Sequence, residues 1–136
     1  MTTPQFLDPS VLLLAVGDEH PMREGCRRVL ERAASGDVRI HLSVEGGQEF
    51  LFHRLRRSPC ERAVEQFDDL LSLVVWHDFT LEVLRASRGL VAQGHARGRD
   101  AVHAATALLA GFTAIVSPDR DFDGIPGLLR VDPSEI

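Results

Sequence analysis

The sequence predicts an α/β domain with a mainly parallel sheet. Short apolar or β-branched runs alternate along the chain with longer segments in which apolar residues recur at helical spacing. Strands that alternate with helices in this way usually form a parallel sheet. The 136 residues match the common size of one domain and include no internal repeat or linker, so we expect one domain over residues 1–136.

Local start and stop signals set the bounds of the expected elements. Pro9 suits the first position of a helix, Ser43 and Thr80 are typical N-caps, and Gly111 follows a helix as a stop signal. Strands are expected at 5–8, 38–42, 73–76 and 113–116 with an edge strand at 128–131, and helices at 9–16, 21–34, 44–57, 59–71, 81–93 and 100–109.

Gly46 and Gly47 lie inside the expected helix 44–57. Each glycine costs a helix ~1 kcal/mol relative to alanine. Either the helix starts later, near Gln48, or the backbone at the two glycines approaches another group closely. The later start is the simpler explanation.

Composition excludes several classes of protein. All 15 basic residues are arginine, and P-loop enzymes, pyridoxal-phosphate enzymes and protein kinases each need a lysine, as phospho-receiver domains normally do. The net charge of −5 means that any nucleic-acid binding must rest on a local basic patch. No apolar stretch approaches the ~18 residues of a membrane span. We expect a cytoplasmic protein in which Cys26 and Cys60 are free thiols.

Four carboxylates lie where a parallel sheet binds its ligands, outside the carboxyl ends of the strands. Asp8 ends the first expected strand, and Asp119 follows the strand 113–116. Asp100 lies in the first turn of the helix before that strand, and Glu49 lies on the helix after the second strand. If the strands that carry Asp8 and Asp119 are neighbours, all four side chains meet in one cleft.

Carboxylates crowded in this way repel one another and take up protons unless a cation joins them. Mg²⁺ and Mn²⁺ prefer oxygen ligands, and such a site hydrolyses phosphodiesters through an activated water. Taken singly, each of the four residues also has an ordinary explanation as a helix cap, a turn residue or a surface acid.

Four segments, taken in order, resemble those of the PIN-domain ribonucleases, and in particular the toxin half of VapBC-type toxin–antitoxin pairs. The similarity spans nearly the whole chain, and the last two segments are the most specific. The segments are Phe6-Leu7-Asp8-Pro9-Ser10, Gln48-Glu49-Phe50-Leu51, Arg99-Asp100-Ala101-Val102-His103, and Ile115-Val116-Ser117-Pro118-Asp119-Arg120-Asp121-Phe122.

The resemblance implies a PIN-like three-layer α/β/α domain with a mainly parallel central sheet of four to five strands. It implies an Mg²⁺- or Mn²⁺-dependent endoribonuclease, the toxin component of a type II toxin–antitoxin system. Its catalytic residues would be Asp8, Glu49, Asp100 and Asp119. The metal ligands would be Asp8, Asp100 and Asp119, with Glu49 and Asp121 direct or through water, and Ser117 and Asp121 in support. Glu45, one turn before Glu49, competes for the role of Glu49.

The resemblance also implies an RNA substrate, a VapB-type antitoxin and a homodimer. Arg54, Arg57 and Arg99 flank the acidic residues in sequence, and we expect them to bind RNA phosphates. The alternative is that they pair with acidic residues on the surface, which is the commoner role of exposed arginines. Six apolar residues in the helices 44–57 and 59–71 fit either a dimer interface or the core. They are Phe50, Leu51, Ala63, Val64, Phe67 and Leu70.

Other functions compete with this one. A catalytically silent PIN-like scaffold and another small metal-dependent phosphohydrolase both remain open. A zinc site at His41, Glu45, Glu49 and His53 is disfavoured because the segment lacks two histidines at i and i+4. His103, three residues after Asp100, could face the same cleft, but an ordinary helix histidine with satisfied hydrogen bonds is the favoured interpretation. The RNA target and the number of metal ions do not follow from the sequence.

Overall fold

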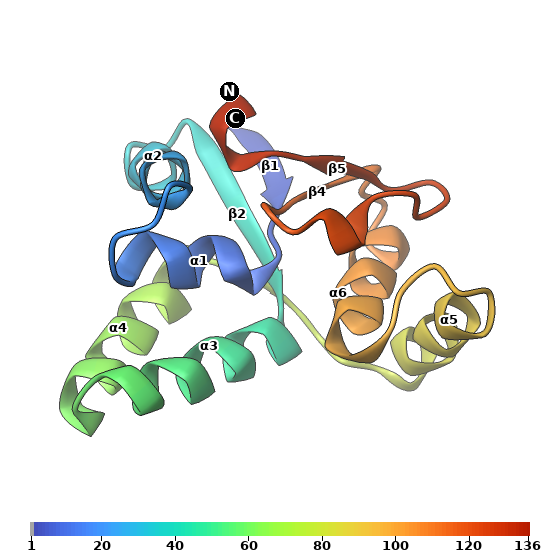
Figure 1. Cartoon of the computed structure of the whole chain (residues 1–136), viewed down its shortest axis with the longest axis horizontal. Coiled ribbons are helices and arrows are strands. Elements are labelled where there is room, and N and C mark those ends of the chain that lie inside the picture. The colour runs from blue at the N-terminus through green and yellow to red at the C-terminus, as the bar shows by residue number, and fades with distance from the viewer. Residues whose placement is uncertain (1) are drawn as a thin grey trace.

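A computed structural model describes residues 2–136 (Figure 1). No helix within these residues is long and apolar enough to span a membrane. The elements in chain order are β1 (Thr3–Phe6), α1 (Pro9–Val16), α2 (Arg23–Ala34), β2 (Val38–Ser43), α3 (Val44–Arg57), α4 (Cys60–Leu73), β3 (Val75–His77), α5 (Leu81–Ala92), α6 (Gly98–Leu109), β4 (Ala114–Val116), a 3₁₀ turn (Arg120–Phe122), β5 (Leu129–Val131) and a last 3₁₀ turn (Pro133–Glu135).

All the strands run parallel, as the sequence predicts. β2 lies between β1 and β3 in a three-stranded sheet, and β4 pairs with β5 in a second sheet. A single parallel bridge between Leu7 and Val116 joins the two sheets. The continuous sheet is therefore smaller than the four to five strands expected. The chain turns into α1 at Pro9 and β4 has only three residues, so β1 and β4 overlap by one pair.

Helices cover both faces of the strands, which confirms the three-layer architecture (Figure 1). Val38, Ile40 and Leu42 alternate along β2 and are buried in a core with α1, α2, α3 and α4. Phe6 and Ile115 point to the opposite face and are buried in a second core with α5 and α6. Side chains alternate between the two faces of a strand, so the strands contribute side chains to the core on each of their faces.

Both predicted N-caps are present. Ser43 Oγ accepts the Gly46 N–H at the start of α3, and Thr80 Oγ1 accepts the Val83 N–H at the start of α5. The expected strand 73–76 starts later, as β3, because α4 continues to Leu73.

The expected late start of the helix at Gly46 and Gly47 is wrong. Both glycines are buried within α3, which begins at Val44. A Cβ atom on Gly47 would lie 2.5 Å from the Trp76 ring, and one on Gly46 would lie 3.1 Å from Leu42. The glycines therefore allow α3 to pack directly on β2 and β3, and this packing places the next helical turn, which carries Glu49.

The apolar residues of α3 and α4 divide between core and surface. Phe50, Ala63 and Leu70 are buried, so core packing accounts for them. Val64 is 42% exposed, and Phe52 and Leu55 on α3 are also exposed. The homodimer stays a prediction.

Candidate functional site

The site lies at the carboxyl ends of β1 and β4. Leu7 bridges Val116, and the Asp8 N–H donates to the Val116 carbonyl at 3.0 Å. The two strands are therefore neighbours, as the convergence of the acidic residues requires. The chain proceeds from β1 to β2 and β3 on one side, whereas β4 and β5 lie on the other. This reversal of strand order is where open α/β sheets bind their ligands.

Asp8 is buried and held by two serine hydroxyls. Ser117 Oγ donates to Asp8 Oδ2 at 2.9 Å, and Ser10 Oγ donates to the same oxygen. Burial raises the pKa of Asp8, and this effect outweighs the lowering by the hydrogen bond from Ser10, by His103 and by the hydrogen bond from Ser117. The Asp8 carboxylate is thus fixed in orientation by hydrogen bonds and forms no salt bridge with an arginine among the described residues.

Ser117 also organises the loop after β4. Its Oγ accepts the Asp119 N–H at 3.0 Å, and Asp119 Oδ1 accepts the Asp121 N–H at 2.9 Å. Arg130 on β5 holds the same loop, because its guanidinium donates to the Ser117 carbonyl at 3.0 Å and to Asp123 Oδ1 at 2.7 Å. Arg130 was not predicted from the sequence, because no local signal links β5 to the loop.

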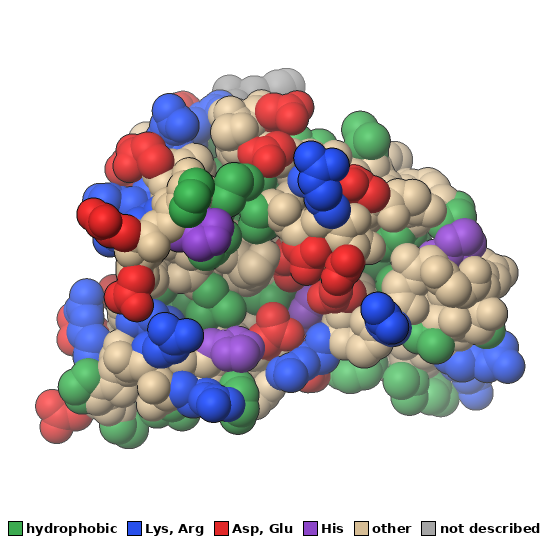
Figure 2. Space-filling model, viewed as in Figure 1, with side chains coloured by type: hydrophobic (Ala, Val, Ile, Leu, Met, Phe, Trp, Pro, Cys, Tyr) green, Lys and Arg blue, Asp and Glu red, His purple; other side chains and the backbone are tan. Residues whose placement is uncertain are grey.

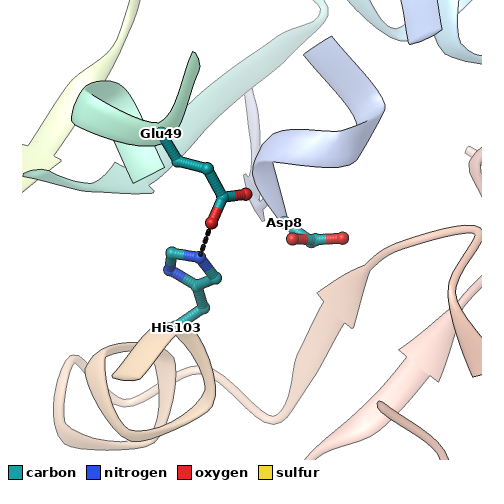
Figure 3. Close-up of side chains that lie close together, drawn as sticks. All are labelled: Asp8, Glu49 and His103. Carbon is teal, nitrogen blue, oxygen red and sulfur yellow. Dashed lines mark ion pairs between the residues drawn. The ribbon is translucent and has the colours of Figure 1, made fainter. Parts of the chain in front are cut away.

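Glu49 reaches the site from α3 and faces α6 (Figure 3). Its Oε1 lies 3.6 Å from His103 Nε2 and 3.4 Å from Arg99 Nε. Burial acts to raise the pKa of Glu49, but the His103 imidazole and the charge of Arg99 beside the carboxylate together leave that pKa lowered. Glu49 is therefore a stable carboxylate without any metal ion.

His103 is fully buried one helical turn after Asp100. Its Nδ1 lies 2.9 Å from Ser43 Oγ, the hydroxyl that caps α3. Its Nε2 has no hydrogen-bond partner among the described residues. The expectation of a histidine with satisfied hydrogen bonds is therefore wrong for this nitrogen. The spacing of three from Asp100 carried the signal, because residues three apart share a helix face.

The acidic cleft contains two triplets. Asp8, Glu49 and His103 form what we call the histidine triplet, and Asp100, Asp119 and Asp121 form the aspartate triplet. Within each triplet one ligand atom from every residue lies within 4.8 Å of the others. All four predicted catalytic residues and Asp121 thus lie at the site, whereas Glu45 belongs to neither triplet.

Asp100 is affected both by burial and by the neighbouring carboxylates. Burial raises its pKa to about 6, and the charges of Asp8 and Asp119 add to the effect. Five carboxylates in one cleft, two of them with raised pKa values, have too little positive charge around them. Such a donor set, rich in oxygen and with one unpartnered imidazole nitrogen, suits a divalent cation.

The three arginines expected to bind RNA lie at different distances from this cleft. Arg99 contacts Glu49 directly. Arg54 and Arg57 line a groove of about 620 Å³ between the end of α1 and α3. Arg54 also donates to Gln66 and Ser58, and exposed Arg57 lies 3.7 Å from Asp18. Figure 2 shows carboxylates gathered at the centre of this face, with arginine and histidine side chains toward α3.

A sequence profile of the PIN domain matches residues 6–128. The chain is 30% identical over 129 residues to the VapC ribonuclease Mb1869c of Mycobacterium bovis, an alignment that covers 93% of this chain and 98% of the relative. It is equally similar to the ribonuclease VapC13 of Mycobacterium tuberculosis, with 30% identity over the same shares of the two chains.

Solved structures share the fold. VapBC2 from Rickettsia felis, bound to a DNA fragment from its promoter, matches with a TM-score of 0.72 and 17% identity over 96% of this chain and 98% of that chain. A toxin–antitoxin complex from Klebsiella pneumoniae matches with a TM-score of 0.70 and 22% identity over 97% and 99% of the two chains. The profile, the relatives and the fold together show that the chain belongs to the PIN-domain family, in its VapC group.

Proposed function

We propose that the chain is a metal-dependent endoribonuclease and the toxin component of a type II toxin–antitoxin system, with residues 1–136 as one PIN domain. The observation that carries the proposal is the convergence of Asp8, Glu49, Asp100 and Asp119 at the reversal of strand order. Four segments far apart in sequence supply these side chains, and ordinary helix capping does not require them to meet.

The side chains have distinct roles in this proposal. Asp8, Asp100 and Asp119 hold Mg²⁺ or Mn²⁺, and Glu49 and Asp121 contribute directly or through water. When bound, the ion neutralises charge on the scissile phosphate and lowers the pKa of the attacking water. Ser10 and Ser117 keep Asp8 oriented toward the cleft by their hydrogen bonds.

Arginines compensate locally for the acidic total charge. Arg99 lies at the edge of the cleft, where it can meet a phosphate beside the scissile one. Arg97 and Arg120 line a second pocket of about 520 Å³ together with Asp100 and Asp121. Arg54 and Arg57 extend the basic surface along α3 and are proposed as outer RNA contacts.

Relatives and structural neighbours suggest the partners. The ribonuclease names come from relatives, and the toxin–antitoxin complexes come from structural neighbours. By analogy we propose that a VapB-type antitoxin binds this chain and blocks its cleft. We also propose that the chain forms a homodimer.

Cleavage of a mixed RNA pool tests the activity. The purified protein, free of antitoxin, is incubated with Mg²⁺ or Mn²⁺ and with EDTA. We expect discrete cleavage that EDTA abolishes and that Asp8→Asn, Asp100→Asn and Glu49→Gln each lower by about 10²–10³-fold. Glu45→Gln is the matched control on the same helix and should retain activity.

Two outcomes would contradict the proposal. If the folded wild-type protein is as inert as its variants with either metal, a binding or scaffold function takes precedence. If it hydrolyses a small phosphomonoester such as p-nitrophenyl phosphate and leaves RNA intact, it is another phosphohydrolase.

A further inference from the structure

We propose that His103 is a metal ligand through Nε2, so that the histidine triplet binds a transition-metal ion such as Mn²⁺ or Zn²⁺ in preference to Mg²⁺. This inference rests on the metal-dependent cleft proposed above, and it assigns a role to the one site residue that the acidic pattern leaves unexplained. It also divides the cleft into two halves of different metal preference.

The first argument is the unpartnered nitrogen. His103 is fully buried, and its Nε2 makes no hydrogen bond within residues 2–136. Glu49 Oε1, at 3.6 Å, is the nearby acidic atom and lies beyond hydrogen-bond distance. Buried polar atoms in native proteins nearly always have a partner, so an orphaned one calls for an explanation such as an ion.

The second argument is the position of that nitrogen. Figure 3 shows the imidazole of His103 and the carboxylates of Asp8 and Glu49 directed toward one shared space. Their ligand atoms lie within 4.8 Å of one another. Ligands about 2.1 Å from one ion are roughly 3–4 Å apart, so small side-chain rotations bring these three atoms to coordination distance.

The third argument is the hydrogen bond at the other ring nitrogen. A histidine that binds a metal donates its remaining N–H to an oxygen, which fixes the tautomer and the ring plane. His103 Nδ1 lies 2.9 Å from Ser43 Oγ. That hydroxyl also accepts the Gly46 N–H, and an oxygen with two lone pairs can accept both. With Nδ1 protonated, the lone pair of Nε2 faces the cleft.

The aspartate triplet provides the contrast. Asp100, Asp119 and Asp121 offer only carboxylate oxygens, which suit Mg²⁺ and Mn²⁺ alike. An imidazole suits transition metals and adds nothing for Mg²⁺. The alternative for His103 is purely structural: Ser43 donates to Nδ1, and the Nε2–H supports Glu49 as a weak hydrogen-bond donor.

Pulsed electron paramagnetic resonance of Mn²⁺ separates these two roles. Untagged protein is loaded with one equivalent of Mn²⁺ in the presence of excess Mg²⁺, which competes for the aspartate triplet, and modulation from a directly bound ¹⁴N is recorded. We expect ¹⁴N modulation in the wild type, its replacement by a ¹⁵N signature after ¹⁵N-histidine labelling, and its loss in His103→Gln. His53→Gln, on α3 one turn after Glu49, is the control and should keep the modulation.

Metal titration provides a second readout. His103→Gln should weaken Mn²⁺ binding by at least about tenfold and leave Mg²⁺ binding nearly unchanged. Bound Mn²⁺ with no nitrogen modulation in the wild type would overturn this inference and leave the proposed nuclease intact. Failure of the wild type to bind any divalent ion would overturn both. If His103→Gln does not fold, the labelled wild type alone decides between a ligand and a structural histidine.

Discussion

Glu49 and Asp100, one from each triplet of the acidic cleft, carry their negative charge under opposite conditions. In the histidine triplet, Glu49 has His103 and Arg99 beside it, and its pKa is lowered. In the aspartate triplet, Asp100 has burial and two further carboxylates around it, and its pKa is raised to about 6. Two carboxylates in one cleft therefore differ in how strongly they need a cation. A metal ion should therefore relieve Asp100 more strongly than Glu49.

Metal binding is the largest effect we expect from this difference. Near pH 7.5, an ion at about 100 times its Kd should raise the free energy of unfolding by about 3 kcal/mol. Near pH 5 the gain should be smaller, because Asp100 is then largely protonated and the ion must displace a proton. Urea unfolding with Mg²⁺ and with EDTA at both pH values measures this. An equal gain at both pH values would mean that Asp100 does not couple to the ion.

The second effect is that Asp100→Asn and Glu49→Gln should change the free energy of unfolding of the metal-free protein in opposite directions. The folded pKa of Asp100, about 6, exceeds the ordinary 3.8, so the folded state binds more protons between these values and stability falls as pH rises through them. Asp100→Asn removes that penalty. It should raise the free energy of unfolding near neutral pH by about 1–2 kcal/mol, after allowance for solvent screening of a partly exposed group. The gain should vanish toward pH 3.8.

Glu49→Gln should act in the other direction. The folded pKa of Glu49 lies below 4.5, so its carboxylate stabilises the fold above that pH and the contribution disappears as pH falls through the lowered value. We expect a loss of about 1 kcal/mol near neutral pH. Urea unfolding of both variants between about pH 4 and 8 measures the two changes in the free energy of unfolding. If Glu49→Gln also raises the free energy of unfolding, Arg99 and His103 do not compensate Glu49. If Asp100→Asn lowers it, the buried Asp100 carboxylate carries no penalty.

The convergence of Asp8 and Asp119 was predictable because it depends on strand ends. Parallel strands bring their carboxyl ends to one edge, so two acids that follow neighbouring strands must approach each other. That the two strands are neighbours was an assumption, and the bridge between Leu7 and Val116 confirms it. The N-cap at Ser43 was equally local and was confirmed.

The residues that the sequence did not reveal act across elements. The position of His103 depends on how α6 faces α3, and that of Arg130 depends on the pairing of β5 with β4. No local pattern marks Arg130, and the spacing of three from Asp100 places His103 on the same helix face without showing what that face contacts. The glycines of α3 were misread for the same reason, since only the packed structure shows Trp76 against Gly47.

The two triplets also differ in what holds their residues in place, because Arg130 supports only the aspartate triplet. The histidine triplet is carried mainly by helices, whereas Asp119 and Asp121 lie in a loop that Arg130 ties to the sheet. Arg130→Met leaves the Ser117 carbonyl and Asp123 without this donor and should lower the free energy of unfolding by about 1.5 kcal/mol. It should also weaken Mg²⁺ binding. Arg120→Met, exposed in the same loop, is the control, and equal effects of the two variants would deny Arg130 this role.

The smallest effect concerns how α3 carries Glu49 to the cleft. Alanine in place of a helical glycine ordinarily gains up to about 1 kcal/mol. Gly89 in α5 has open space where a Cβ would lie, so Gly89→Ala should show this gain. Gly47→Ala instead meets the Trp76 ring, which also donates to the Leu71 carbonyl, and displacement of the ring should outweigh the gain by about 1 kcal/mol.

The same displacement should move Glu49 relative to His103. Gly47→Ala is therefore expected to weaken Mn²⁺ binding as well as stability, whereas Gly89→Ala should change stability alone. Urea unfolding and Mn²⁺ titration of the two variants measure both effects. If Gly47→Ala stabilises the protein as much as Gly89→Ala does, Trp76 yields without cost and the close packing of α3 on β3 does not set the position of Glu49.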